Sequence, residues 1–205
     1  MRLPDTTILS ATEITRQHDH LTALWHEQQS TIPAENLGEF LDTVIAQHLA
    51  NFELWHTEDK ARAPQATDHD LAEVKRDIDR INQHRNDLAE RCDMALLDHL
   101  RALNLPNPKA ELNSESPGLM IDRMSILALK IFHTAEEILR PDAPEGHAER
   151  NQKRLDILKD QRDDLAGCLD HLWRQTLAGN RRFKLYLQLK MYNDPALNPA
   201  VYGQK

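Results

Sequence analysis

The chain has 205 residues, of which 28% are charged, and its formal net charge is −8 at pH 7. This length suits one domain with a substantial core, and the negative charge argues against a nucleic-acid-binding protein. Neither a secretory signal nor an apolar run long enough to span a membrane is recognisable, so we expect a cytoplasmic protein.

Composition and patterning predict an all-α fold, because the chain has only six glycines and 5% aromatic residues, and strand alternation is nowhere sustained. We expect a single helical domain over residues 1–205. Its core would be a four-helix bundle of two hairpins, joined by an N-terminal helix and a basic C-terminal helix. Cys92 and Cys168 have no metal-like spacing and fall in helical apolar patterns, which predicts two buried thiols.

The first predicted elements are two helices. The capping-box sequence Ser10-Ala-Thr-Glu13 opens the first one, of about 18 residues. The second runs from about residue 34 to residue 62. Its apolar stripe consists of Leu41, Ile45, Phe52 and Trp55, and is continued by His48, Asp59 and Arg62. The charged end of this helix is therefore expected to point where its core residues point.

A third helix is predicted to begin at Thr67, with Arg85 lying on its apolar stripe. The stripe consists of Leu71, Val74, Ile78, Ile81, Leu88, Cys92 and Ala95. A polar stripe of Asp79, Asn82, Asn86 and Asp93 adjoins it. One flank of this helix is therefore expected to face a lined cavity rather than solvent.

Ser116 and Pro117 follow a loop over residues 104–115 and predict the start of a central fourth helix. Apolar residues cover nearly every face of this helix up to Phe132, which is typical of a buried helix. Asp122, Arg123, Ser125 and Lys130 interrupt the run, and such side chains are costly to bury unless paired or used. The small residues at the helix start favour an anion site, with an ordinary capped helix as the alternative.

A fifth helix is predicted to end at Gly179, with Arg162 interrupting its leucine stripe. That stripe consists of Leu155, Leu158, Leu165, Leu169 and Leu172. The tail then carries Arg181, Arg182, Lys184 and Lys190 with no acidic residue until Asp194. Two interpretations stay open for it: an anion clamp, or a helix that covers the end of the bundle.

A shift of 77 residues suggests an internal repeat of residues 34–103 over 111–179. At this shift Trp55-His56-Thr57 falls on Phe132-His133-Thr134, and Arg85 falls on Arg162. The alternative is coincidence, because 77 is a multiple of seven and any two stripes of coiled-coil type would align.

Metal chemistry is indicated by histidines and carboxylates spaced one helical turn apart. The pairs are Glu53 with His56, His56 with Asp59, and His133 with Glu136. Bundle proteins assemble divalent-metal sites from such pairs on facing helices. The alternative is that they form buried salt bridges or solvated carboxylates.

Several stretches together resemble a bacterial family, the domain-of-unknown-function family numbered 4254. They include NFELWHTEDKAR, RDIDRINQHRNDLAERCD, LNSESPGLMIDRMSILALKIFH and FKLYLQLKMYNDPALNPAVY, within residues 45 to 202. The resemblance implies a small cytoplasmic all-α protein and a context of lipopolysaccharide and other surface-glycan assembly. It supplies no catalytic residue.

We therefore predict a protein that binds or processes a phosphorylated ligand, either a nucleotide sugar or a sugar phosphate, in surface-glycan metabolism. Catalysis would use Glu53, His56, Asp59 and Asp87. Ligand binding would use Arg62, Arg85, Asn86, Asn113, Ser114, Ser116, Asp122, Arg123, Lys130, Arg162, Arg182, Lys184 and Lys190. The alternatives are an adaptor that docks a glycosyltransferase and a metal-dependent all-α enzyme like the nucleotide pyrophosphohydrolases. For the first prediction, Arg85, Arg123 and Arg162 should be buried, each beside a carboxylate from another helix.

Overall fold

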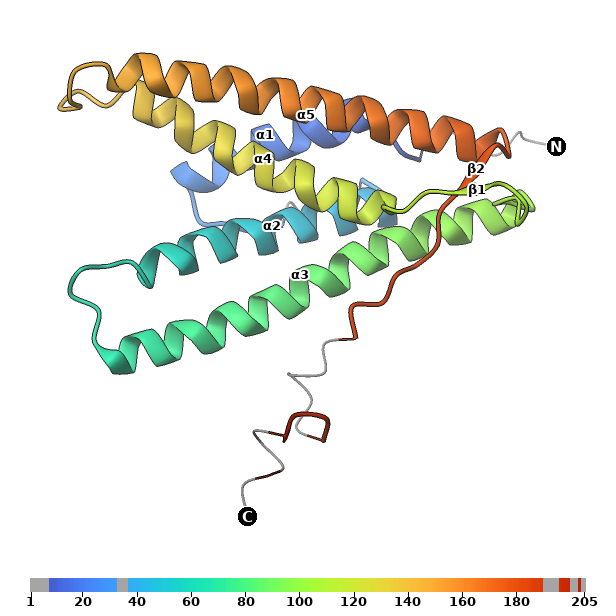
Figure 1. Cartoon of the computed structure of the whole chain (residues 1–205), viewed down its shortest axis with the longest axis horizontal. Helices are drawn as coiled ribbons and strands as arrows, with labels where there is room; N and C mark the ends of the chain where they lie inside the picture. The colour runs from blue at the N-terminus through green and yellow to red at the C-terminus, as the bar shows by residue number, and fades with distance from the viewer. Residues whose placement is uncertain (1–7, 33–36, 190–195, 200–202, 204–205) are drawn as a thin grey trace.

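The computed structural model describes residues 8–32, 37–189, 196–199 and 203. Its elements are α1 (Ala11–Glu27), α2 (Glu39–Lys60), α3 (Asp68–Ala102), β1 (Glu111–Leu112), α4 (Pro117–Ile138), α5 (His147–Leu177) and β2 (Arg181–Arg182). Figure 1 shows α2 with α3, and α4 with α5, as two antiparallel hairpins, and α1 packs against α4. The predicted all-α bundle with an N-terminal helix is confirmed. No helix within these ranges is long and apolar enough to cross a membrane.

Local sequence signals account for the helix starts. The Ser10 side chain accepts a hydrogen bond from the first turn of α1, and Thr67 and Asp70 form a complete capping box at the start of α3. Gly38 precedes α2 with φ of 100°, a conformation that favours glycine. The second helix therefore begins at Glu39, later than predicted, and residues 33–36 lie outside the described ranges.

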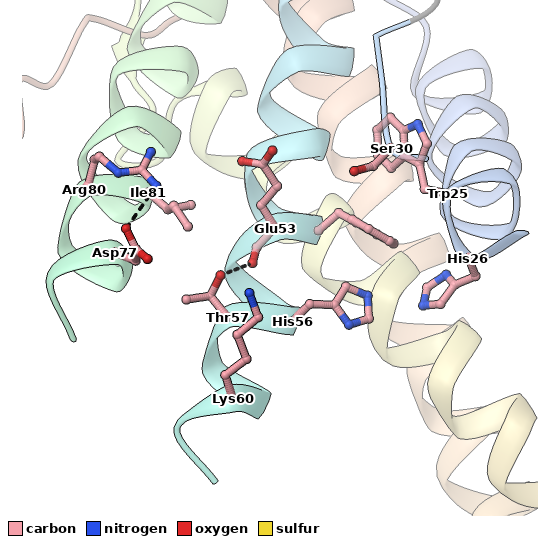
Figure 2. Close-up of a pocket in the computed structure, with 11 residues that line it drawn as sticks. Trp25, His26, Ser30, Glu53, His56, Thr57, Lys60, Asp77, Arg80 and Ile81 are labelled. Carbon is pink, nitrogen blue, oxygen red and sulfur yellow. Dashed lines mark hydrogen bonds and ion pairs between the residues drawn. The ribbon is translucent and has the colours of Figure 1, made fainter. Parts of the chain in front are cut away.

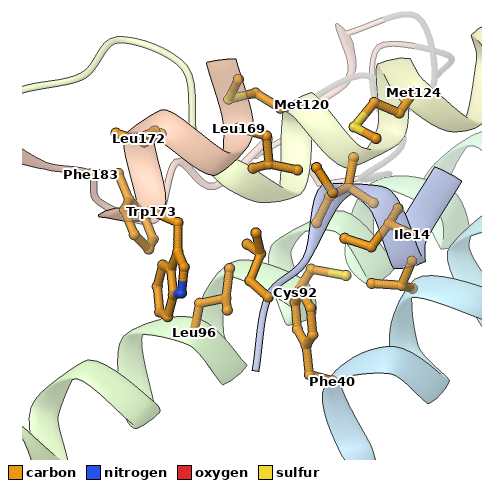
Figure 3. Packing of buried hydrophobic residues seen from close by; sticks show 14 of the residues in the cluster. Ile14, Phe40, Cys92, Leu96, Met120, Met124, Leu169, Leu172, Trp173 and Phe183 are labelled. Carbon is orange, nitrogen blue, oxygen red and sulfur yellow. The ribbon is translucent and has the colours of Figure 1, made fainter. Parts of the chain in front are cut away.

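The larger apolar core joins all five helices (Figure 3). Its members include Ile14 of α1, Phe40 of α2, Cys92 and Leu96 of α3, Met120 and Met124 of α4, and Leu169, Leu172 and Trp173 of α5. Each fully buried side chain of this kind contributes about 1.5–3 kcal/mol, so the cluster holds the hairpins together. A smaller cluster of Leu21, Trp25, Ile45, Phe52 and Leu129 lies toward the other end of α1.

Three residues predicted to be buried with their helices are in fact exposed. Arg123 and Lys130 lie two turns apart on the one side of α4 that faces solvent, so α4 is not buried all round. Cys168 is exposed on α5, whereas Cys92 is buried as predicted. Leu71 is also 39% exposed, because the first turns of α3 are open to solvent on nearly every side.

The predicted C-terminal helix is wrong for the described residues. Glu111 and Leu112 pair in parallel with Arg181 and Arg182, and residues 183–189 form no helix. Phe183 is buried whereas Lys184 is exposed, which is the alternation of a strand. The segment then crosses α3, where the Gln188 amide donates to the Glu90 carboxylate at 2.8 Å. Lys190 lies outside the described residues.

The helix bounds agree with the predicted internal repeat. A shift of 77 residues carries the ends of α2 onto those of α4 within one residue, and those of α3 onto those of α5 within two. Superposition of the two hairpins in space stays a prediction.

Candidate metal centre

Three histidines from three helices meet beside the smaller apolar cluster. His26 is in the last turn of α1, His56 is near the end of α2, and His133 is in the second half of α4. One ring nitrogen from each lies within 4.8 Å of the other two. Figure 2 shows the rings of His26 and His56 pointing toward one another. Within the described ranges, no other three His, Cys, Asp or Glu side chains converge in this way.

Hydrogen bonds at Nδ1 orient two of these rings and fix their tautomers. The Nδ1 atom of His26 is 2.7 Å from the Thr22 carbonyl oxygen, and that of His133 is 2.9 Å from the Glu136 carboxylate. Because a carbonyl or carboxylate oxygen only accepts, both Nδ1 atoms carry protons. The His56 Nδ1 atom lies 3.9 Å from Asp59, an ion-pair distance rather than a hydrogen bond.

The opposite ring nitrogen, Nε2, is buried without a hydrogen-bond partner in His26, His56 and His133. In the neutral form of His26 and His133 this atom carries the lone pair, since the proton is on Nδ1. A buried acceptor that lacks a donor destabilises the fold, and two acceptors cannot hydrogen-bond to one another. A single water molecule can donate only two hydrogen bonds, so it would leave one of the three nitrogens unpaired. A cation held between the rings would satisfy all three nitrogens at once.

The spacing is close to that of a zinc site. In four-coordinate zinc, bonds of about 2.0–2.1 Å place the ligand nitrogens roughly 3.3 Å apart, so the three rings, whose nitrogens lie within 4.8 Å of one another, would have to move closer to bind the ion. A carboxylate or carbonyl that accepts from the non-ligating ring nitrogen is a usual feature of metal-bound histidine. Glu136 and the Thr22 carbonyl are in this position. Burial, with the adjacent His26 and His133 rings, lowers the pKa of His56.

Aromatic rings pack around the cluster. Phe132 stacks on His26 with centroids 4.2 Å apart, and Trp55 stacks on His133 at 4.9 Å. Phe52 contacts His26 and His56 edge-on, at 5.0 and 4.5 Å. These contacts restrict the rings and exclude water from the side of the cluster that faces the core.

A pocket of about 620 Å³ opens beside His26 and His56, between α1, α2 and α3 (Figure 2). Its charged lining consists of Glu53 and Lys60 of α2 and Asp77 and Arg80 of α3. Glu53, His56 and Lys60 follow one another at three- and four-residue steps, which places them on one face of α2. A ligand in this pocket would therefore meet the histidine cluster, a carboxylate and a cation together.

Arg85 and Asp122, both predicted ligand-binding residues, pair with one another on the other side of α2. Arg85 Nη1 donates to Asp122 Oδ2 at 3.2 Å, and their side chains are 18% and 14% exposed. Asn51 donates to the same carboxylate at 3.0 Å, and Gln47 donates to it as well. Burial raises the pKa of Asp122 against the opposing effect of Arg85.

The network continues from Asn51 into the core. Asn51 donates to Ser125 Oγ at 2.9 Å, and Ser125 lies 2.7 Å from His48 Nδ1. His48 Nε2 is 3.0 Å from both the His18 carbonyl and Thr22 Oγ1. Burial lowers the pKa of His48 to about 3. Because Ser125 and His48 are fully buried, this serine–histidine pair has a structural role.

The three predicted arginines do not share one cavity. Arg162 is 12% exposed and donates to Asp19 of α1 at 2.7 and 2.8 Å, so its predicted burial and partner are confirmed, as they are for Arg85. Arg123 is 58% exposed and pairs with Glu115, which lies in the loop before α4. The prediction is wrong for Arg123, because this side of α4 faces solvent. Together with Lys130 it lines a separate groove between α4 and α5.

The N-terminus of α4 is already capped by the protein. The Asp93 carboxylate of α3 accepts from the Gly118 amide at 2.7 Å and is 3% exposed. Gly118 permits this approach, since a Cβ there would lie 2.2 Å from the Ala89 carbonyl oxygen. A phosphate at this helix start would have to displace a buried carboxylate, so the structure favours the alternative of a capped helix. Burial raises the pKa of Asp93 to about 6.

The remaining predicted residues lie in three other places. Asp87 is exposed on α3 and accepts from Gln83, and Asn86 is partly buried beside it. Arg62 pairs with Glu58 at the end of α2. At the β1–β2 end of the bundle are Asn113, Ser114, Ser116, Arg182 and Lys184. There the Arg182 side chain donates to the Ala110 carbonyl oxygen, and Lys184 lies over the Tyr186 ring.

His26 is the member of the cluster that the sequence prediction missed, whereas His56, His133, Asp59 and Glu136 were predicted. It lies 30 residues before His56 and forms no acidic or histidine pair at helical spacing within α1. The Thr22 carbonyl oxygen, one turn earlier, accepts a hydrogen bond from the His26 ring, but such a contact is not recognisable in the sequence. Glu53 was predicted as a metal ligand, but it lines the pocket outside the three-histidine group.

The fold and the site define an all-α bundle protein with a half-buried histidine cluster beside a charged pocket. Residues 41–185 match the family described as a protein of unknown function, DUF4254, and the chain belongs to this family, as its motifs predicted. The match includes His56 and His133, whereas His26 precedes it. No curated protein and no solved structure matches the chain.

Proposed function

We propose that this protein binds one Zn²⁺ ion through His26, His56 and His133 and uses it to hydrolyse a phosphorylated small molecule. Two observations carry the proposal: one ring nitrogen of each histidine lies within 4.8 Å of the other two, and the Nε2 atoms of all three are buried without a hydrogen-bond partner. Imidazole is a preferred ligand of zinc. Three histidines leave the fourth coordination position open to water or substrate, which is the arrangement of catalytic rather than structural zinc sites.

The adjoining pocket supports hydrolysis. When bound, zinc would supply a water molecule whose pKa is near neutrality. Glu53 lines the same pocket as His56, three residues earlier on α2, and would be the carboxylate that accepts a proton from that water. Lys60 and Arg80 line the same pocket and can bind phosphoryl oxygens. The predicted phosphorylated ligand is thereby assigned to this pocket rather than to the start of α4.

The expected role in surface-glycan metabolism is used here only to choose the substrates for the assay. Zinc-loaded protein and protein stripped with a chelator would be assayed against sugar phosphates, nucleoside diphosphates and nucleotide sugars, with phosphorus NMR to identify products. We expect turnover of at least one class, and only with metal. Glu53→Gln should lower kcat by about 100-fold or more while zinc remains bound. Glu73→Gln, an exposed substitution on α3 outside the pocket, is the matched control.

One result would reject the hydrolase, and another would reject the role assigned to Glu53. Zinc binding without turnover of any substrate class would favour the non-catalytic adaptor, and unchanged turnover in Glu53→Gln would remove the assigned base. If the products show that nucleotides are cleaved at the bond between two phosphates, the alternative of a metal-dependent enzyme like the nucleotide pyrophosphohydrolases would be favoured.

A further inference from the structure

Arg85 has a hydrogen-bonding edge that the Asp122 pair does not use. Within the described part of the chain its hydrogen bonds all run through Nη1, to Asp122 and to Asn51 Oδ1 at 3.3 Å. Its Nε atom is buried without a partner. In a guanidinium group the Nε–H bond lies on the same edge as Nη2, and this edge matches the two oxygens of a carboxylate. An acceptor placed there would satisfy the buried donor.

Arg85 also lines a pocket of about 330 Å³ between α2, α3 and α4. The walls are apolar, from Leu54 and Trp55 of α2 and Ile126 and Leu129 of α4. This volume is at the small end of ligand sites and suits a compact molecule that is mainly apolar. One face of Trp55 stacks on His133, and a flat ring is the natural occupant beside the rest of its surface.

Charges at the rim of this pocket have partners of their own. Arg62 pairs with Glu58 at 3.2 Å, and Asp59 faces His56 at 3.9 Å. Among the lining residues, the one with a buried donor left unpaired is therefore Arg85, which lies between the apolar wall and the polar lining residues Asn51, Glu58, Asp59 and Arg62. A phosphate dianion would be costly to desolvate in so apolar a pocket, whereas one carboxylate carries less charge and fits the guanidinium edge.

We propose that this pocket is a second ligand site, which binds a small aromatic carboxylate. Its ring would pack against Trp55 and Ile126, and its carboxylate would bind the free edge of Arg85. The site lies on the opposite face of α2 from the pocket beside His26 and His56, because Asn51 and Trp55 project away from Glu53 and Lys60. It is therefore a separate pocket, although its wall residue Trp55 also stacks on His133 of the proposed metal centre.

The test uses the full chain, free of metal, with 4-phenylbutyrate as the probe. Binding is followed through the indole N–H signal of Trp55 in nitrogen-15 NMR spectra, which Trp55→Phe assigns among the three tryptophans. We expect a saturable shift of this signal. The uncharged amide of the probe should bind about tenfold more weakly or worse, because it lacks the carboxylate that matches the guanidinium.

Variants test the two contacts separately. Arg85→Lys keeps a cation beside Asp122, so the fold is retained, but it loses the planar edge, and affinity should fall about tenfold. Arg91→Lys, an exposed change on the same helix, should bind like the wild type. Ile126→Trp should fill the pocket and abolish binding without altering Arg85.

The proposal is overturned if the Trp55 signal does not move with the probe at concentrations up to about 10 mM, weaker than any useful small-molecule site. Equal binding of acid and amide, or unchanged affinity in Arg85→Lys, would equally reject recognition by Arg85. Unchanged binding in Ile126→Trp would place the probe elsewhere.

Discussion

Substitution of Glu136 tests whether His133 binds zinc or is an ordinary surface histidine. Its carboxylate accepts from His133 Nδ1 at 2.9 Å, which holds Nε2 toward His26 and His56. Glu136→Gln keeps the size of the side chain and removes its charge. If His133 binds zinc, the ring becomes a poorer ligand and zinc affinity falls.

The size of the effect follows from the exposure of Glu136. Loss of such a partner lowers metal affinity by about 10- to 100-fold, and the Glu136 side chain is 55% exposed, so we expect the lower end. At free zinc 100 times the wild-type dissociation constant, the ion should stabilise the wild type by about 2.7 kcal/mol and a tenfold weaker variant by about 1.4 kcal/mol. For a chain of this size the difference corresponds to roughly 3–5 °C in Tm.

The assay is a thermal melt with and without zinc, and Glu137→Gln is its matched control. Glu137, the next residue of α4, pairs with His147 at 2.8 Å, and His147 is outside the cluster. Both variants therefore lose one carboxylate–histidine pair, and their melts without zinc should be similar. Only Glu136→Gln should lose part of the zinc-dependent rise. An equal rise in both variants, or no rise in the wild type, would refute the role assigned to His133.

Three further predictions concern the packing of α4 on α3 and the stability of α5. Asp93→Asn keeps an oxygen that accepts from the Gly118 amide but removes the charge. Burial raises the pKa of Asp93 from 3.8 to about 6 in the folded state, so as the pH falls through 6 the folded wild type binds a proton that neither its unfolded state nor the variant binds. Between about pH 7.5 and 4.5, denaturant titrations should show the wild type gaining about 2 kcal/mol relative to the variant, and a constant difference would disprove this. Gly118→Ala should cost about 1–3 kcal/mol through its clash with Ala89, measured in the same way. Gly167→Ala, where a Cβ meets nothing within 4 Å, should instead stabilise α5 by up to about 1 kcal/mol, and equal effects would contradict the packing argument.

Helix starts and stripes were predictable because their causes are local. Ser10, Thr67 and Ser116 stand at the N-cap positions of α1, α3 and α4 as expected; the Ser10 and Thr67 side chains cap their helices, whereas the Ser116 side chain makes no capping hydrogen bond. The tail was mispredicted because its structure depends on a distant segment. Arg181 and Arg182 pair with Glu111 and Leu112, and residues 183–189 form neither helix nor strand.

The candidate site was only partly predictable, because it depends on contacts between distant segments. His56 and His133 stood out through their acidic neighbours one turn away, but nothing near His26 marks it as their partner. The structure disfavours the anion site expected at Ser116 for a similar reason. The helix start was correct, yet the carboxylate that caps it, Asp93, comes from another helix, and its approach depends on the missing side chain of Gly118.

The most direct test of the metal centre is X-ray absorption spectroscopy of the zinc-loaded protein, with the zinc content measured on the same sample. We predict one zinc per chain and three imidazole nitrogens at about 2.0–2.1 Å, with a lighter fourth ligand and no sulfur. Substitution of His26, the member without a sequence signal, by Gln should remove one imidazole from the spectrum. Failure to retain zinc, a sulfur shell near about 2.3 Å, or a spectrum unchanged by His26→Gln would contradict the assignment.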